Sequence, residues 1–204
     1  MDTKAMNEYL TFWKERGLDF IIPPETDDPE GFDIGEVLGR VCSSKILEVG
    51  CGTGRIAKYL DARKYFGVDI NSVAIDKAKA ENPGYKFSVI DLKRALPASD
   101  TVLFYTVCLH IPDDLIAAQL KRAALSTKRI VIAEIMNPKY RDNRDPSLDY
   151  DISNQRSLDQ YVDLMKEDVH RPTLLVDIAP LPLDKITALA GGLRIGAGAS
   201  NAAA

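Results

Sequence analysis

The stretch Ile46-Leu47-Glu48-Val49-Gly50-Cys51-Gly52-Thr53-Gly54-Arg55 decides the fold class. A short apolar strand leads into it, and three glycines at alternate positions then turn the chain. Glycine permits a sharp turn and leaves room for a ligand to approach the main chain. The dinucleotide-binding pattern G-x-G-x-x-G needs a third glycine at position 55, where this chain has Arg55. The loop therefore follows a different pattern, Glu48-x-Gly50-x-Gly52-x-Gly54.

Apolar strands and helices alternate along most of the chain. The predicted strands are 45–49, 65–70, 85–90, 101–109, 129–135, 173–179 and 185–190, with helices over 55–60, 71–81, 112–124 and 158–165. Such alternation indicates parallel strands joined by right-handed crossovers. We expect an α/β fold, a doubly wound, mostly parallel seven-stranded sheet with flanking helices and an antiparallel last strand. Either Asn71 or Ser72 is the predicted cap of the helix over 71–81, and Ser157 with Gln160 is the predicted capping box of the helix over 158–165.

The length of 204 residues fits one domain, residues 1–204. Residues 1–44 contain an amphipathic helix followed by prolines, and we interpret them as an N-terminal flap or lid, or else as a simple packing appendage. Residues 45–135 form the core of the domain. Residues 136–195 form a polar loop and a C-terminal hairpin, and 196–204 a Gly/Ala tail.

The composition disfavours several classes of partner and site. The formal net charge is −4, which disfavours a nucleic-acid partner, and no run of about 18 apolar residues predicts a membrane span. Three cysteines without C-x-x-C spacing and two histidines predict no metal site and reduced thiols. We therefore expect a cytoplasmic protein whose partner is a small molecule.

Four motifs in order give the chain a recognisable resemblance. The Glu48–Gly54 loop, Gly67–Ile70, Val89–Leu92 and Ser99–Asp114 resemble the motifs of class I S-adenosylmethionine-dependent methyltransferases over about residues 40–135. The last one is similar to the family's L-H-H-I-P-D segment, with Leu109 in place of the first histidine. The resemblance implies a Rossmann-like methyltransferase fold, S-adenosyl-L-methionine as cofactor and S-adenosyl-L-homocysteine as product.

The resemblance also implies which residues bind the cofactor. Asp69 would accept bonds from the ribose hydroxyls, and Asp91 would meet the adenine amino group; a carboxylate suits both tasks as an acceptor with two oxygens. Glu48 either touches the cofactor or holds the glycine loop, and Tyr105 either lines the methionine end or belongs to the core. The implied cofactor-binding set is Glu48, Gly50, Cys51, Gly52, Gly54, Asp69, Ile70, Asp91, Leu92 and Tyr105.

His110 is the candidate catalytic residue. Methyl transfer requires alignment of donor and acceptor and, for a hydroxyl or ammonium acceptor, removal of a proton, for which histidine is suited. The alternatives are packing at a helix start or lining of the substrate site. The expected acceptor walls are Tyr9 and Trp13 of the flap and Arg141 and Arg144 of the loop. An arginine there would grip a carboxylate or phosphate, unless these charges pair with one another.

The expected reaction is methyl transfer to an oxygen or nitrogen of a small molecule. The strand end Phe104-Tyr105-Thr106-Val107 lacks the [DN]-P-P-[YF] pattern of enzymes that methylate planar amino nitrogens, and no Pro-Cys pair offers a nucleophile for cytosine C5. Two other readings stay open: a non-catalytic cofactor-binding module that supports a partner protein, and a nucleotide-cofactor oxidoreductase.

Overall fold

The sheet of this computed structural model has eight strands. The structure describes residues 3–17, 34–42, 44–91, 94–134, 136, 154, 156–166, 169, 171–177, 186–190 and 193–196. The strands are β1 (Ile46–Val49), β2 (Tyr65–Asp69), β3 (Lys86–Val89), β4 (Thr101–Tyr105), β5 (Arg129–Glu134), β6 (Thr173–Asp177), β7 (Ile186–Ala190) and β8 (Leu193–Gly196). They lie in the order β3-β2-β1-β4-β5-β6-β7-β8, with β1 to β6 parallel and β7 and β8 antiparallel to their neighbours.

The predicted fold class is confirmed, and one strand was missed. The expected antiparallel strand over 185–190 is β7, which pairs with β6. The additional strand β8 ends at Gly196, the first residue of the expected Gly/Ala tail. Leu193-Arg194-Ile195 has the alternation of a short strand, and the glycines and alanines around it hide that pattern.

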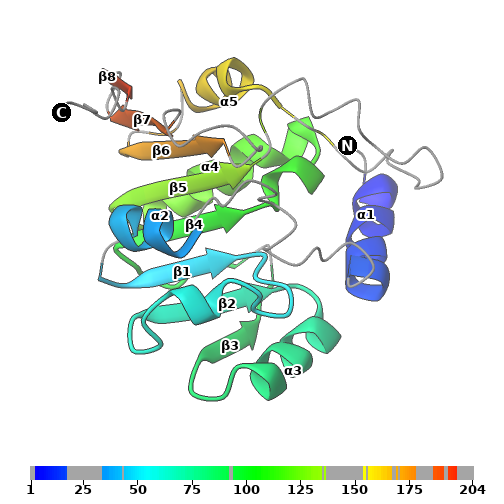
Figure 1. Cartoon of the computed structure of the whole chain (residues 1–204). Coiled ribbons are helices and arrows are strands. Elements are labelled where there is room, and N and C mark those ends of the chain that lie inside the picture. The colour runs from blue at the N-terminus through cyan, green and yellow to red at the C-terminus, as the bar shows by residue number, and fades with distance from the viewer. Residues whose placement is uncertain are drawn as a thin grey trace.

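Helices cover both faces of the sheet (Figure 1). They are α1 (Thr3–Arg16), α2 (Ile34–Val41), α3 (Ser72–Glu81), α4 (Asp113–Ser126) and α5 (Leu158–Met165), with short 3₁₀ helices η3 (Ala57–Tyr59) and η4 (Cys108–His110). One core cluster joins the sheet to α2, η3 and α3, and the other joins it to α4 and α5. Along β4, Leu103 and Tyr105 enter the first cluster, while Val102 and Phe104 enter the second. This alternation is what a strand buried on both faces requires.

Two predicted elements are shorter in the structure. The helix expected over 55–60 is a series of turns ending in η3, with bonds three residues apart such as Ala57 N–H to Gly54 O at 3.0 Å. Six residues are too few to sustain an α-helix by themselves. The strand expected over 101–109 ends at Tyr105, because Thr106 has φ +50° and turns the chain out of the sheet into η4.

Two predicted helix caps are confirmed. The Asn71 side-chain oxygen accepts the N–H of Ala74 at 3.0 Å and so begins α3. At α5, Ser157 accepts the N–H of Gln160 at 3.4 Å, and the Gln160 side chain accepts the N–H of Ser157 at 2.8 Å. These bonds satisfy N–H groups that a helix start leaves without partners.

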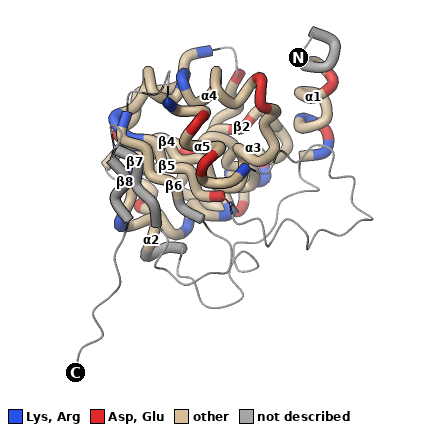
Figure 2. The backbone as a smooth tube through the Cα atoms, turned by 90° about the horizontal axis from the view of Figure 1, so that it is seen from above, with Lys and Arg blue, Asp and Glu red and all other residues tan. Residues whose placement is uncertain are grey.

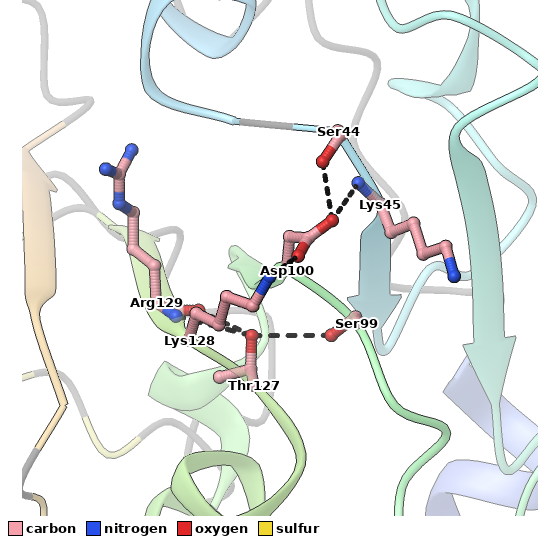
Figure 3. A network of polar contacts seen from close by, with 7 residues as sticks. All are labelled: Ser44, Lys45, Ser99, Asp100, Thr127, Lys128 and Arg129. Atoms are coloured by element: carbon pink, nitrogen blue, oxygen red, sulfur yellow. Dashed lines mark hydrogen bonds and ion pairs between the residues drawn. The ribbon is translucent and has the colours of Figure 1, made fainter.

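A polar network ties the edge of the sheet where the strands begin (Figure 3). Asp100, just before β4, accepts bonds from Ser44 Oγ at 2.5 Å, the Lys45 N–H at 3.1 Å and Lys128 Nζ at 2.7 Å. The bonds from Lys128 and Ser44 lower the pKa of Asp100 to about 2. The network therefore joins the starts of β1, β4 and β5 on the side opposite to the carboxyl ends of the strands.

The described parts of residues 1–44 take two different positions. Val37 and Leu38 of α2 are buried in the core. In contrast, α1 stands outside the layered body, beyond the carboxyl ends of the strands (Figure 1, Figure 2). Of the helices described, none is both long and apolar enough to cross a lipid bilayer.

Candidate active site

A cavity opens where the crossovers of the sheet diverge. The strand β1 lies between β2 and β4, so the chain leaves β1 toward one side of the sheet and leaves β4 toward the other. Open α/β sheets bind ligands at the carboxyl edge beside such a switch point. The segments that line the cavity here are 50–52 after β1, 69–71 after β2 and 105–107 after β4, together with His110 and Ile111.

The glycine loop brings the main chain to the cavity. Gly50, Gly52 and Gly54 have φ values of +77°, +52° and +73°, a region that side chains disfavour. A Cβ at Gly50 would lie 2.3 Å from Val107 Cγ2, so glycine lets this loop approach the β4 loop. A Cβ at Gly54 would lie 2.7 Å from Phe87 Cζ. Gly50, Cys51 and Gly52 line the cavity, whereas Gly54 packs against β3.

Glu48 lies beneath the loop rather than in the cavity. Its side chain is 2% exposed and accepts a hydrogen bond from the Tyr65 hydroxyl, which joins β1 to β2. Burial raises the pKa of Glu48 to about 7, although the Tyr65 bond and the nearby Arg55 oppose the shift. Glu48 is not among the residues that line the cavity, and its bond goes to β2 rather than to the glycine loop, so both of its roles stay predictions.

Asp69 connects the glycine loop to the start of α3. Its Oδ2 accepts the N–H of Gly52 at 2.9 Å, and its Oδ1 accepts the N–H of Asn71 at 2.9 Å. Burial raises the pKa of Asp69, and the bonds from these main-chain groups oppose the shift. Each carboxylate oxygen accepts more than one hydrogen bond, so capacity for a ligand's hydroxyl groups remains. Ile70 lines the cavity beside it.

Asp91 lies in an adjoining hollow. This second hollow shares Ile70 and Ile90 with the cavity and is bordered by Lys14 of α1. Asp91 is exposed. Leu92, Arg141 and Arg144, which the sequence also marks as candidates, lie outside the described residues.

α1 closes the outer side of the cavity with aromatic rings. The ring centres of Trp13 and His110 are 4.5 Å apart. The ring of Tyr9 meets that of Trp13 edge-on, with 6.5 Å between the ring centres. The Asn71 side-chain amide donates to the Trp13 carbonyl at 3.1 Å, which ties α1 to the end of β2. Tyr9, Trp13 and His110 therefore face the glycine loop across one space.

The histidine is held in its neutral form. Burial lowers the pKa of His110 to about 4, and the charge of Arg55 adds to this shift. Nδ1 of His110 is buried and has no hydrogen-bond partner in the described part of the chain. A neutral imidazole offers one donor and one acceptor nitrogen, so this ring is able to accept a proton or a hydrogen bond at neutral pH.

Four residues around the site are not among those predicted from the sequence: Arg55, Thr106, Glu134 and Arg156. The guanidinium of Arg55 stacks 4.7 Å from the Tyr105 ring centre and donates to Thr106 Oγ1, and all three residues line the cavity. Glu134 and Arg156 are buried beneath the turn that carries His110. Glu134 had a recognisable signal, because it is the last residue of its strand, as Asp69 is.

The described residues hold no group of three or more His, Cys, Asp or Glu side chains placed to bind a metal ion. Cys42, Cys51 and Cys108 are all free thiols. Burial raises the pKa of Cys51 and Cys108 well above the usual value, so neither is a thiolate at neutral pH.

Comparisons with known proteins agree with this geometry. Residues 46–129 match the family model described as a methyltransferase domain. No curated protein matches the chain. Among solved structures, the magnesium protoporphyrin IX methyltransferase ChlM from Synechocystis PCC 6803, with bound S-adenosylhomocysteine, has a TM-score of 0.59 at 13% identity, covering 95% of this chain and 96% of that one. The complex of DhpI with S-adenosylmethionine and HEP has a TM-score of 0.60 at 15% identity, covering 86% and 92%.

A further similar structure is a methyltransferase of Thermotoga maritima, described as a possible histamine N-methyltransferase. It has a TM-score of 0.54 at 17% identity, covering 81% of this chain and 77% of that chain. The family-model match spans β1 to the start of β5, which supplies most of the residues that line the cavity. The match shows a methyltransferase domain over residues 46–129, and the solved structures show the fold that this domain has.

Proposed function

We propose that the protein is an enzyme that transfers a methyl group from S-adenosylmethionine to an oxygen or nitrogen of a small molecule. The observation that carries this proposal is the single cavity in which the glycine loop and Asp69 face Trp13 and His110. The first pair suits a cofactor, and the second pair suits an acceptor. Donor and acceptor would thus be held side by side, which is the main requirement for an in-line displacement.

The cofactor half of the proposal rests on the segments at the strand ends. The main chain of 50–52 would lie along the methionine and ribose parts of the cofactor. Asp69, already oriented by the N–H groups of Gly52 and Asn71, would accept the ribose hydroxyls. Asp91 in the adjoining hollow would accept the adenine amino group, with Ile70 and Ile90 against the ring.

The acceptor half rests on His110 and α1. The sulfonium already activates the methyl carbon, so the protein's task is to orient the acceptor and receive its proton. His110 is neutral above pH 5 and lines the cavity, which suits it to take a hydrogen bond or a proton from a hydroxyl or amine. The rings of Tyr9 and Trp13 would cover the acceptor and exclude water.

A methyl-transfer screen tests the proposal directly. Purified protein is incubated with S-adenosylmethionine carrying a radiolabelled methyl group and with fractionated metabolite pools, while calorimetry measures cofactor binding. We expect label in a small-molecule fraction and a large loss of transfer in His110→Gln, with unchanged transfer in His170→Gln, the chain's other histidine. Tight cofactor binding without any transfer would favour the non-catalytic module, and binding of NAD(H) alone would favour the oxidoreductase.

A further inference from the structure

The turn that carries His110 is too short to hold its own shape. It spans Val107 to Ile111 and contains η4, whose internal bonds are His110 N–H to Val107 O and Ile111 N–H to Cys108 O, both at 3.0 Å. A single 3₁₀ turn has weak bonds and rarely persists without support. The position of the His110 ring must therefore depend on groups outside the turn.

Glu134 holds the turn by its N–H groups. This residue ends β5 and is fully buried, and its Oε1 accepts the N–H groups of Cys108 at 2.6 Å and Leu109 at 3.4 Å. Its Oε2 has no hydrogen-bond partner in the described chain. Burial raises the pKa of Glu134 to about 8, while these main-chain bonds and the charge of Arg156 oppose the shift.

Arg156 holds the same turn by its carbonyl groups. Its side chain is 3% exposed, and Nη1 donates to Cys108 O at 2.8 Å while Nη2 donates to Ile111 O at 2.6 Å. Nε and Nη2 also donate to Asp113 Oδ1 at 2.9 and 2.6 Å, which fixes the guanidinium against the start of α4. A planar fork of donors is needed to reach all of these acceptors at once.

The two side chains approach the turn from elements that are distant in sequence. Glu134 comes from β5, and Arg156 immediately precedes the cap of α5. Glu134 accepts the N–H of Cys108, and Arg156 donates to the carbonyl of the same residue. Neither side chain lines the cavity. Both side chains therefore bind the turn that carries His110, whose ring lies against Trp13.

We propose that Glu134 and Arg156 are positioning residues that fix His110 in the cavity for methyl transfer. The inference rests on the proposed function for the importance of His110, but the geometry of the turn is measurable without turnover. Misplacement of a reacting group by about 1 Å can cost up to 100-fold in rate, so loss of either side chain should lower kcat more than cofactor affinity.

The test compares matched variants. Arg156→Lys keeps the charge but cannot span the two carbonyls, Glu134→Ala removes the acceptor and Glu134→Gln keeps it. Asp113→Asn weakens the hold on Arg156 at a position that is 82% exposed, so this variant is expected to fold. Asp100→Asn is the control, because it disturbs a carboxylate of similar bonding at the opposite edge of the sheet (Figure 3).

The first readout is the NMR titration of the His110 ring, in a His170→Gln background that leaves one histidine to observe. In the unaltered turn, His110 should stay neutral from pH 8 to 5.5, since burial lowers its pKa to about 4. In Arg156→Lys and Glu134→Ala, a displaced and hydrated ring should titrate within this range, with a smaller upward shift in Asp113→Asn. Glu134→Gln and Asp100→Asn should keep the original behaviour.

The second readout is kinetic, once an acceptor is known. We expect Arg156→Lys to lower kcat by about tenfold or more, with cofactor affinity changed less than about twofold. An unaltered His110 titration in Arg156→Lys and Asp113→Asn, with a stability loss like that of Asp100→Asn, would overturn the inference. Because the titration needs no turnover, a protein without transferase activity but with the predicted titration changes would refute the proposed function and leave the positioning geometry intact.

Discussion

Replacement of Gly50 by alanine should separate two costs that the glycine loop avoids. Gly50 has φ +77°, and a Cβ built on it would lie 2.3 Å from Cγ2 and 2.9 Å from Cβ of Val107. The left-handed conformation costs about 1–2 kcal/mol for a residue with a side chain. Overpacking against the half-buried Val107 adds about 1–3 kcal/mol. We therefore expect Gly50→Ala to lower the free energy of unfolding by about 2–5 kcal/mol.

Gly84→Ala provides the matched control. Gly84 has φ +95°, but a Cβ there would meet nothing within 4 Å, so this variant carries the conformational cost alone. The reduced entropy of the unfolded chain affects both variants alike and cancels in their difference. The difference, about 1–3 kcal/mol, then measures the contact with Val107.

Urea denaturation followed by circular dichroism measures these free energies. The double variant Gly50→Ala/Val107→Ala lacks both Cγ atoms of Val107, and Cγ2 is the atom at 2.3 Å. Its loss in free energy of unfolding should therefore be smaller than the sum of the losses of the two single variants. Calorimetry should show weaker S-adenosylmethionine binding in Gly50→Ala, because Val107 also lines the cavity. Equal losses for Gly50→Ala and Gly84→Ala, or strict additivity with Val107→Ala, would show that Val107 does not exclude a side chain at position 50.

Four other outcomes are expected. Asp69→Ala should weaken cofactor binding in calorimetry by at least about 100-fold, because two charge-assisted bonds of roughly 1.5–3 kcal/mol each are lost; a lower Tm with unchanged affinity would make Asp69 a purely structural acceptor. The pKa of His110 is lowered to about 4 in the folded chain, so as the pH falls the unfolded chain binds the proton first. From pH 7 to 5 the free energy of unfolding of the wild type should therefore fall by about 2 kcal/mol, and that of His110→Gln should not show this loss. The pKa of Glu48 is raised to about 7, so its contribution to folding stability is lost as the pH rises. Between pH 5 and 8 the free energy of unfolding of Glu48→Gln should rise by about 2–3 kcal/mol relative to that of the wild type. Parallel curves of stability against pH would contradict a buried carboxyl group at this position. Trp13, the chain's only tryptophan, should shift its fluorescence when S-adenosylhomocysteine binds, whereas constant emission would indicate a permanently packed α1.

Local patterns predicted seven of the eight strands and the two helix caps. The apolar runs that become β1, β2 and β4 are buried strands, and Asn71 caps α3 because its short side chain reaches the N–H three residues on. The resemblance to methyltransferase motifs, rather than a local pattern, marked Asp69 and Asp91 as candidates. Parallel strands bring their carboxyl ends to one edge of the sheet, which is where both residues lie.

Contacts between distant segments were beyond the sequence. Thr106 lies in the middle of an apolar run that predicts a longer strand, and only its bond from Arg55 and its φ of +50° show that the strand ends there. Glu134 and Arg156 meet around one turn although 22 positions separate them. Periodicity predicts which face of a strand or helix a residue occupies, but it does not predict the hydrogen-bond partners of a buried charged side chain.

Asn71 uses both ends of one side-chain amide. A helix cap needs only the oxygen, which accepts the N–H of Ala74, so serine or aspartate would serve equally well there. The NH₂ group is additional, and it holds the carbonyl of Trp13. Asn71→Asp would therefore keep the cap of α3 and lose the hydrogen bond to α1, so one NH₂ group decides whether the start of α3 is tied to the helix that carries Trp13.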